Sequence, residues 1–347
     1  MYPGIIFLFF RRSIAISIAL FICVAISGCG PLETAIRGET MGTTYSIKIM
    51  TGRFVKTGHL PGLVDARLQE INASMSTFIE DSEISKFNAS IGKVPFTPTA
   101  DFLEVMQVAM DIHKRSGGAW DGSLDPLVTL WGFGRDGQKE QPPAQEEIEA
   151  SLSQVDFSKV SISSDGKFLK NDPRLTIDLA SIAKGYGVDA IAALLKTEGY
   201  EDFLIEIGGE IFASGKRDNN TPWRVGVNTP SSSAGFGQVY KVLSVGGKGL
   251  ATSGDYRNFF VSEGRMYSHI LDPRTGYPVT NGVVSASVIA KTCTLADGLA
   301  TALMVMGPDS GLALVEQMTN VEALIIVRNQ DGDFEEYPSS SFAEYEL

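Results

Sequence analysis

The alternation of hydrophobic and polar side chains over residues 44–49 predicts a half-buried strand, because side chains in a strand point to opposite faces in turn. Apolar residues recur at helical spacing over residues 63–75, which predicts an amphipathic helix. A second helix is expected to begin near Thr99 and to end at the glycine pair 117–118. Residues 135–147 are polar and contain two adjacent prolines, which indicates a surface loop.

The second half of the chain is richer in short apolar runs that predict strands. Residues 175–177 predict a short strand that leads into a helix at about 182–198, which ends at Gly199. An apolar segment at 295–305 predicts a last helix before a closing hairpin near 322–337. Strands and helices mix without a regular β-α-β alternation, which favours an α+β fold with mixed or antiparallel sheets and packed helices over a doubly wound fold. Further strands are expected at 160–162, 203–207, 223–227, 239–245, 257–262, 266–271 and 283–290.

Composition and charge narrow the class of protein. The chain has 347 residues, of which 44% are hydrophobic and 20% charged, as expected for a protein that folds around a core. Its formal net charge of −12 has the wrong sign for non-specific binding to nucleic acid, so we expect no nucleic-acid partner. The three cysteines and three histidines do not have the spacing of a structural zinc site.

The first 28 residues have the pattern of an export signal. Two arginines precede an apolar run over 14–26, which is shorter than a membrane-spanning helix needs. The run ends in Ile-Ser-Gly followed by Cys29, which resembles a bacterial lipobox. Residues 1–28 are therefore predicted to be a lipoprotein signal peptide and Cys29 to be lipidated. The alternative is a plain N-terminal membrane anchor with an incidental cysteine.

This interpretation divides the remaining chain into two parts. Residues 29–40 are expected to be a tether, and residues 41–347 a single domain. The domain would be lipid-anchored to a bacterial membrane and would face the periplasm or the cell exterior.

The segment 178–187 is a candidate site for an anion and a metal ion. Asp178 follows a predicted strand, and Lys184 lies near the start of the next helix. The free N–H groups at a helix N-terminus can bind phosphate. The alternative is an ordinary strand-to-helix junction with Ser181 as its N-cap. The glycine pair 208–209 also permits two interpretations, which are a close approach of a ligand to the backbone or a bulge or turn.

His269 is the histidine best placed for proton transfer. It lies in a predicted strand just before a turn that contains Pro and Gly, and imidazole is a suitable general base near neutral pH. The alternative is a core histidine with satisfied hydrogen bonds, which is the interpretation that we favour for His113 on its apolar helix face. We assign no role to His59.

Asp297 and Thr301 are four residues apart near the start of the last apolar helix and therefore share one face. Their carboxylate and hydroxyl oxygens are the kind of ligand that Mg²⁺ binds. The alternative is a polar first turn in which Asp297 complements the helix dipole. Cys293, at the same helix start, is interpreted as a packing residue.

Taken together, these segments resemble the ApbE family of flavin transferases. Eight matching stretches follow one another in order and span nearly all of the predicted domain. The resemblance implies the T-fold-like α+β architecture of that family. The stretches are GETMGTTY at 38–45, MSTF at 75–78 with SEISKFN at 82–88, GAWDG at 118–122 with DPL at 125–127 and LWGFG at 130–134, DLASIAKGYG at 178–187, GG at 208–209, TSGDYR at 252–257, SHILDPRTG at 268–276 and TCTLADGLATA at 292–302.

The resemblance implies that the protein splits FAD at its pyrophosphate with the help of Mg²⁺, releases AMP, and attaches FMN to a threonine or serine hydroxyl. The acceptor would be an exported or membrane-bound redox protein. His269 is similar to the family histidine that deprotonates this hydroxyl. Metal ligands are implied at the backbone of Ala180 or Ser181 and at the side chains of Asp297 and Thr301. Flavin contacts are implied at Met41, Phe78, Ala119, Trp120, Asp121, Asp178, Lys184 and Leu271.

Two other functions are compatible with the sequence. The first is a Mg²⁺-dependent FAD pyrophosphatase, which gives FMN and AMP with water as the acceptor. The second is a flavin-binding lipoprotein without catalysis, which needs neither His269 as a base nor the pair Asp297 and Thr301. A structural lipoprotein without a ligand is disfavoured by the eight ordered stretches.

Overall fold

The computed structural model of the chain covers nearly all of the predicted domain. The described residues are 32–92, 94–134, 137, 139, 141–231, 237–256 and 258–347. The predicted signal peptide, Cys29 and residue Arg257 of the 252–257 stretch lie outside them. The helices are α2 (Leu60–Met75), α3 (Glu83–Ala89), α4 (Ala100–Arg115), α5 (Asp125–Leu130), α6 (Gln145–Leu152), α7 (Ala180–Thr197) and α8 (Cys293–Val315), with the short 3₁₀ helices η1 (Phe157–Lys159), η2 (Asp218–Asn220) and η3 (Phe342–Tyr345). The strands are β1 (Leu32–Thr40), β2 (Thr43–Thr51), β3 (Val160–Ile162), β4 (Phe168–Lys170), β5 (Phe203–Ile207), β6 (Glu210–Ser214), β7 (Val225–Asn228), β8 (Val239–Leu243), β9 (Gly249–Gly254), β10 (Phe259–Ser262), β11 (Arg265–Ser268), β12 (Val283–Ala290), β13 (Glu322–Arg328) and β14 (Phe334–Pro338).

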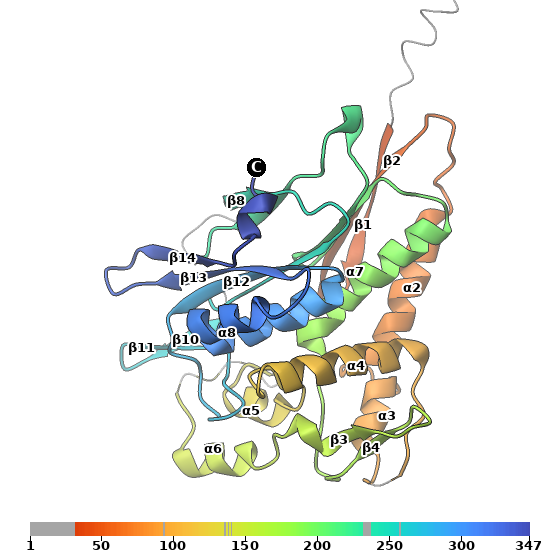
Figure 1. The fold of residues 1–347 in the computed structure, drawn as a ribbon. Coiled ribbons are helices and arrows are strands. Elements are labelled where there is room, and N and C mark those ends of the chain that lie inside the picture. The colour runs from red at the N-terminus through yellow and green to blue at the C-terminus, as the bar shows by residue number, and fades with distance from the viewer. Residues whose placement is uncertain are drawn as a thin grey trace, which may run out of the picture.

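An eight-stranded sheet forms the centre of the fold, in the order β1-β2-β5-β6-β9-β12-β13-β14 (Figure 1). Each strand in it pairs antiparallel with its neighbours. The expectation of an α+β fold is therefore confirmed, since a doubly wound fold is built on parallel strands. The remaining described strands form three pairs, β3-β4, β7-β8 and β10-β11.

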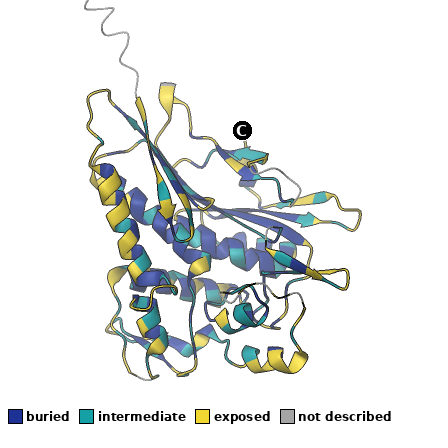
Figure 2. Ribbon diagram, turned by 180° about the vertical axis from the view of Figure 1, so that it is seen from behind, coloured by how far each residue is buried: buried dark blue, intermediate teal, exposed yellow. Residues whose placement is uncertain are grey.

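Both faces of the central sheet are covered, and β12 is consequently buried along its whole length. Helices α7 and α8 pack on one face, and the buried residues in Figure 2 concentrate in these helices and in the middle of the sheet. The other face is covered by β7, β8 and η3, through Val225, Leu243 and Phe342. A strand that meets no water on either face is expected to be mostly apolar, and β12 consists of apolar residues apart from the buried Ser285 and Ser287.

Two carboxylates, one from each helix, join α7 to α8. Asp189 of α7 accepts hydrogen bonds from the N–H groups of Cys293 and Thr294, each at 2.8 Å, and so satisfies the N-terminus of α8. Asp297 of α8 accepts in return from the N–H of Gly185 in α7 at 2.9 Å. The helices come this close because Gly185 has no side chain, since a Cβ there would lie 2.8 Å from the Cβ of Asp297.

The structure corrects the predicted tether at its C-terminal part. Residues 32–40 are not a tether but form β1, which pairs with β2 from Leu32 opposite Thr51 to Thr40 opposite Thr43. The sequence of β1 contains several charged and polar residues because this strand lies at the edge of the sheet, where one side of the strand meets solvent.

Three other predicted elements differ from the structure for identifiable reasons. Residues 175–177 are not a strand, because the side chain of Asn88 makes both hydrogen bonds to the main chain of Ile177 that a neighbouring strand would make. Helix α6 begins inside the predicted surface loop, where Glu147 accepts from the N–H of Ala144 and stabilises the first turn. Helix α8 is longer than expected and continues through a break at Gly307.

Among the described residues, α8 is the one helix that is long and apolar enough to cross a membrane. It packs instead against α4, α7, β9 and β12. Its apolar residues therefore belong to the core of the domain.

The contact between α7 and α8 makes a stability prediction. Gly185→Ala places a methyl group against Cys293 and Asp297, and overpacking of this kind lowers the free energy of unfolding by about 1–3 kcal/mol. The control is Gly62→Ala in α2, where no atom lies within 4 Å of the added Cβ. We expect Gly62→Ala to leave the thermal unfolding midpoint unchanged or slightly raised. Equal midpoints for both variants would show that the close approach at Gly185 does not determine stability.

Candidate active site

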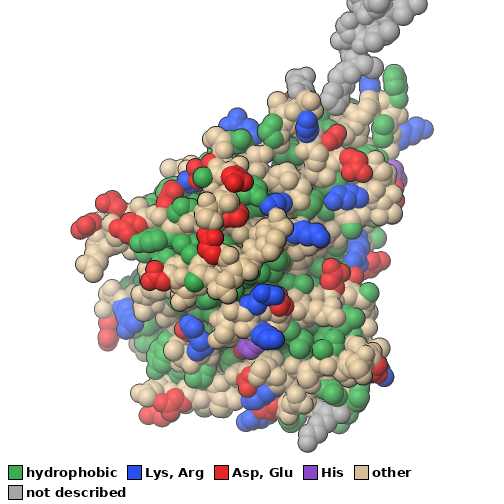
Figure 3. Space-filling model, viewed as in Figure 1, with side chains coloured by type: hydrophobic (Ala, Val, Ile, Leu, Met, Phe, Trp, Pro, Cys, Tyr) green, Lys and Arg blue, Asp and Glu red, His purple; other side chains and the backbone are tan. Residues whose placement is uncertain are grey.

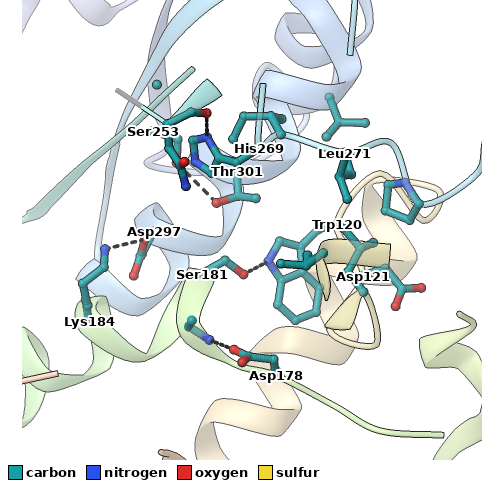
Figure 4. A pocket seen from close by; sticks show the side chains of 18 of the residues that line it. Trp120, Asp121, Asp178, Ser181, Lys184, Ser253, His269, Leu271, Asp297 and Thr301 are labelled. Atoms are coloured by element: carbon teal, nitrogen blue, oxygen red, sulfur yellow. Dashed lines mark hydrogen bonds and ion pairs between the residues drawn. The ribbon is translucent and has the colours of Figure 1, made fainter. Parts of the chain in front are cut away.

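Most of the residues implied as site residues line one cavity of about 530 Å³. The first turn of α7, one face of α8, the end of β9, the segment before α5 and the segment after β11 form its walls (Figure 4). The position of His269 differs slightly from expectation, because β11 ends at Ser268 and His269 follows it. The implied site residues in the lining are Ala119, Trp120, Asp121, Asp178, Ala180, Ser181, Lys184, His269, Leu271, Asp297 and Thr301.

The two remaining residues, Met41 and Phe78, line a second cavity of about 340 Å³ that shares Asp178, Ala180 and Lys184 with the first. Met41 occupies the two-residue turn between β1 and β2 with a positive φ of 51°. A left-handed backbone conformation is costly for a residue with a side chain, and such strain is found at functional sites. The side chain of Phe78 is largely exposed at the rim of this cavity.

The N-terminus of α7 is connected to both cavities by side-chain hydrogen bonds. Asp178 accepts from the N–H of Ala180 at 2.6 Å and from the hydroxyl of Thr77 at 3.1 Å. Ser181 is not the N-cap that the simpler interpretation proposed, because α7 already begins at Ala180. Its hydroxyl instead accepts from the indole N–H of Trp120 at 3.0 Å, and this bond fixes the buried indole ring in the cavity wall.

Asp121 lines the first cavity, but its carboxylate is bound to the protein. It accepts from the N–H groups of Ser123 at 2.7 Å and Phe157 at 3.0 Å. His113 lies 3.5 Å from the same carboxylate, and its Nδ1 is 2.9 Å from the main-chain oxygen of Trp120. His113 is therefore a positioned structural histidine, in agreement with its interpretation from the sequence.

A buried charge cluster joins α7, α8 and β6. The ammonium group of Lys184 lies 2.7 Å from Oε1 of Glu210 and 4.0 Å from Oδ1 of Asp297. Burial alone would lower the pKa of Lys184, but the two carboxylates outweigh burial and raise the pKa, so the lysine is charged. Burial, together with the neighbouring carboxylate, raises the pKa of Glu210. The second oxygen of Glu210, Oε2, is buried without a hydrogen-bond partner among the described residues.

The geometry of His269 identifies its basic atom. The Nδ1 atom lies 3.0 Å from the main-chain oxygen of Asn258, and because a carbonyl only accepts, Nδ1 carries the proton. The other ring nitrogen, Nε2, is then the acceptor and the basic atom. Burial lowers the pKa of His269 below its usual value of 6.5, although the contact with Asn258 partly opposes this effect. The imidazole is therefore neutral and basic at neutral pH.

The cavity offers oxygen ligands for a hard cation. Besides Asp297, it exposes the hydroxyl of Thr301, which lies 3.3 Å from the hydroxyl of Ser253. Across the described residues, no group of three or more His, Cys, Asp or Glu side chains is arranged to hold a metal ion. A cation in this cavity would therefore take at most two carboxylates together with hydroxyl, carbonyl and substrate oxygens, which is the ligand set that suits Mg²⁺.

Sequence reasoning did not identify Glu210 and Ser253 as site residues. Glu210 directly follows the glycine pair 208–209, which forms the turn between β5 and β6 with both φ angles positive. The pair makes the hairpin turn, as one of the two interpretations expected, and Gly208 also lines the cavity. In the sequence, Glu210 is marked only as an acidic residue at the start of an apolar run.

The fold and the cavity define an α+β protein with an acidic, oxygen-lined candidate site, and comparison with known proteins identifies its family. The model of the ApbE family matches residues 41–325. The chain is 41% identical over 329 residues to the FAD:protein FMN transferase of Vibrio cholerae, which covers 94% of this chain and 97% of the relative. It is 35% identical over 341 residues to the protein of the same name from Haemophilus influenzae, with 96% and 97% covered. The chain therefore belongs to the ApbE family.

Solved structures of the family have the same fold. The flavin transferase ApbE from Vibrio cholerae superimposes with a TM-score of 0.82 at 39% identity and covers 91% of this chain and 99% of its own. The apo form of the flavinyl transferase ApbE from Pseudomonas stutzeri gives a TM-score of 0.80 at 36% identity, with 91% and 97% covered. The ApbE-like architecture that the resemblance implied is confirmed.

Proposed function

We propose that this protein transfers FMN from FAD to a threonine or serine hydroxyl of a second protein and releases AMP. The observation that carries the proposal is the convergence of a neutral histidine, a lysine and an acidic oxygen cluster around one cavity, beside a second cavity with apolar walls. The names of the Vibrio cholerae and Haemophilus influenzae relatives describe FMN transfer from FAD to protein.

The two cavities suggest how FAD would be divided between them. The isoalloxazine ring fits the second cavity, whose walls include Ile71, Met75 and the thioether of Met41, since flat aromatic ligands pack on apolar and thioether groups. The pyrophosphate would then lie at the shared wall, beside the N-terminus of α7. Free N–H groups and the positive end of the helix dipole favour phosphate there.

The charge of the first cavity supports a requirement for Mg²⁺. Its described lining contains five carboxylates and a single lysine, so an unaccompanied pyrophosphate would be repelled. Asp297, Thr301 and the main chain of Ala180 or Ser181 would hold the ion. When bound, Mg²⁺ would neutralise charge on the phosphate oxygens and make the phosphorus atom more electrophilic.

The proton transfer is assigned to His269. Its Nε2 atom would take the proton of the acceptor hydroxyl as the hydroxyl oxygen attacks the phosphorus atom of the FMN half. A new oxygen–phosphorus bond forms while the pyrophosphate bond breaks, and AMP leaves with the bonding electron pair. Lys184 is held by Glu210 and Asp297, so it orients and balances the cluster and does not act as a proton donor.

We also propose that the protein is a lipoprotein on the outer side of a bacterial membrane. The support is the sequence around Cys29, and β1 begins three residues after it. The acceptor would then be an exported or membrane-bound redox protein.

The central prediction concerns Asp297. The mature protein mixed with FAD, Mg²⁺ and a threonine-bearing acceptor domain should add an FMN-sized mass to the acceptor and release AMP, and EDTA should abolish both. Asp297→Asn keeps the shape and an acceptor for the N–H of Gly185, and should reduce transfer about 100-fold or more because a metal ligand is lost. Asp309→Ala, at an exposed position of the same helix, should transfer FMN normally.

Two results would redirect the assignment. FMN and AMP without an acceptor adduct would indicate a pyrophosphatase that uses water. Intact FAD after long incubation would indicate a flavin carrier without catalysis.

A second prediction concerns His269. His269→Ala should reduce transfer by about 10²–10⁴-fold and leave the Kd for FAD nearly unchanged, because the base acts on the acceptor hydroxyl. In the wild type, transfer should be lost as pH falls through the lowered pKa of His269, so the acidic inflection should lie below pH 6.5. His59→Ala, an exposed histidine that contacts Glu198, is the control and should keep the wild-type profile. An unchanged pH profile in His269→Ala would exclude this base.

The anchor makes a third prediction. Protein extracted from bacterial membranes with detergent should begin at Cys29 and carry the added mass of a diacylglyceryl group. Cys29→Ser should remove the acyl mass and leave the signal peptide attached. An unmodified N-terminus that still contains residues 1–28 in the wild type would support the plain membrane anchor instead.

A further inference from the structure

Residues 52–57, in the loop between β2 and α2, carry two exposed apolar side chains. The side chain of Phe54 is 88% exposed and that of Val55 is 50% exposed. Arg53 and Lys56 flank them and are exposed too. The loop has a defined turn, since the N–H of Val55 donates to the main-chain oxygen of Gly52 at 3.0 Å. An aromatic side chain held in water beside two cations is typical of a segment that meets a lipid interface.

The N-terminus of the domain lies beside this loop. Leu32 pairs with Thr51, the last residue of β2, and Leu32 is itself 55% exposed. Figure 3 shows hydrophobic and basic side chains together at this end of the molecule. We refer to Leu32, Arg53, Phe54, Val55 and Lys56 as the basic-apolar tip.

The number of residues between Cys29 and Leu32 limits the distance between an anchored Cys29 and the basic-apolar tip. Three residue steps separate Cys29 from Leu32, and a fully extended chain spans at most about 11 Å over three steps. Interfacial segments insert by about 5–10 Å into the boundary between headgroups and acyl chains. On the lipid anchoring proposed above, the tip therefore lies within reach of the lipid surface.

We propose that the basic-apolar tip is a membrane-contact surface, in which Phe54 and Val55 enter the lipid interface and Arg53 and Lys56 bind anionic headgroups. The anchor at Cys29 restricts the distance of the domain, and the tip would restrict its orientation. Two contacts on one rigid body prevent the domain from rotating freely about a single tether.

This orientation sets the height of the active site. Helix α7 runs from the cavity at Ala180 towards the tip, and its 18 residues span about 27 Å. At the far end, Glu198 lies 3.0 Å from His59, which directly precedes α2. The cavity would thus face an acceptor hydroxyl displaced from the lipid surface by roughly the length of α7, which suits the extracytoplasmic part of a membrane-bound partner.

The test uses a chain that begins at Cys29, coupled through its thiol to a maleimide lipid in preformed vesicles. The coupling is specific because Cys293 is fully buried, and it does not depend on native lipidation. Phe54→Trp introduces a reporter at the tip, whereas Trp120, Trp131 and Trp223 are all buried. The control is Ile91→Trp, at a position that is 78% exposed, two residues after α3 at the opposite end of the molecule (Figure 1).

In vesicles of phosphatidylglycerol with brominated phosphatidylcholine, we expect the emission added by Phe54→Trp to fall by about two-fold or more, with a blue shift, because the indole lies at bromine depth. The emission added by Ile91→Trp should not change. The double variant Arg53→Glu and Lys56→Glu, made in the Phe54→Trp chain, should reduce the quenching. Equal quenching at both positions, or quenching at neither, overturns the proposal.

The outcome is separable from that of the lipoprotein proposal. An unacylated wild-type N-terminus would refute native lipidation without changing the quenching of the chemically coupled chain. Absence of quenching in that chain would refute the membrane-contact surface even if Cys29 is acylated in the cell.

Discussion

Helices α7 and α8 can reach the same cavity wall because Gly185 lets them touch and a carboxylate from each helix holds them there. Asp189 satisfies N–H groups at the start of α8, and Asp297 returns a bond to the N–H of Gly185. Burial raises the pKa values of both carboxyl groups, and the hydrogen bonds from N–H groups partly offset that cost. The same contact positions Lys184 on one helix and Thr301 on the other, so the site depends on the packing of the core.

The cluster of Lys184, Glu210 and Asp297 is poorly compensated within the protein itself. Two carboxylates face one ammonium group, and one oxygen of Glu210 has no hydrogen-bond partner among the described residues. A buried polar atom without a partner costs about 1–3 kcal/mol, so such a cluster lowers stability. A divalent cation would however interact favourably with this excess negative charge, and the cation would in turn bind phosphate. Local instability of this kind is expected at functional sites.

Helices and strands with a clear local sequence pattern were predicted, and those without one were missed. The strands at 203–207 and 283–290 and the start of α4 near Thr99 were predicted because mostly apolar runs and helical spacing mark them in the sequence. Strand β9 escaped prediction because it consists largely of small residues and is buried by its neighbours β6 and β12. Spacing alone did not bring together residues as distant as Asp178 and Asp297, and the ordered family stretches supplied that grouping.

The proposed base and the charge cluster come from different parts of the fold. Lys184 and Asp297 belong to helices packed on the central sheet, whereas His269 follows β11, in a two-stranded pair outside that sheet. His269 is fixed by the main-chain oxygen of Asn258, which selects the Nδ1–H tautomer and leaves Nε2 as the acceptor. The separation has a chemical consequence, since the group proposed to receive a proton is placed independently of the groups proposed to balance phosphate charge. On the proposed mechanism, changes in the hairpin would alter which hydroxyl is deprotonated without disturbing the core that would bind the nucleotide.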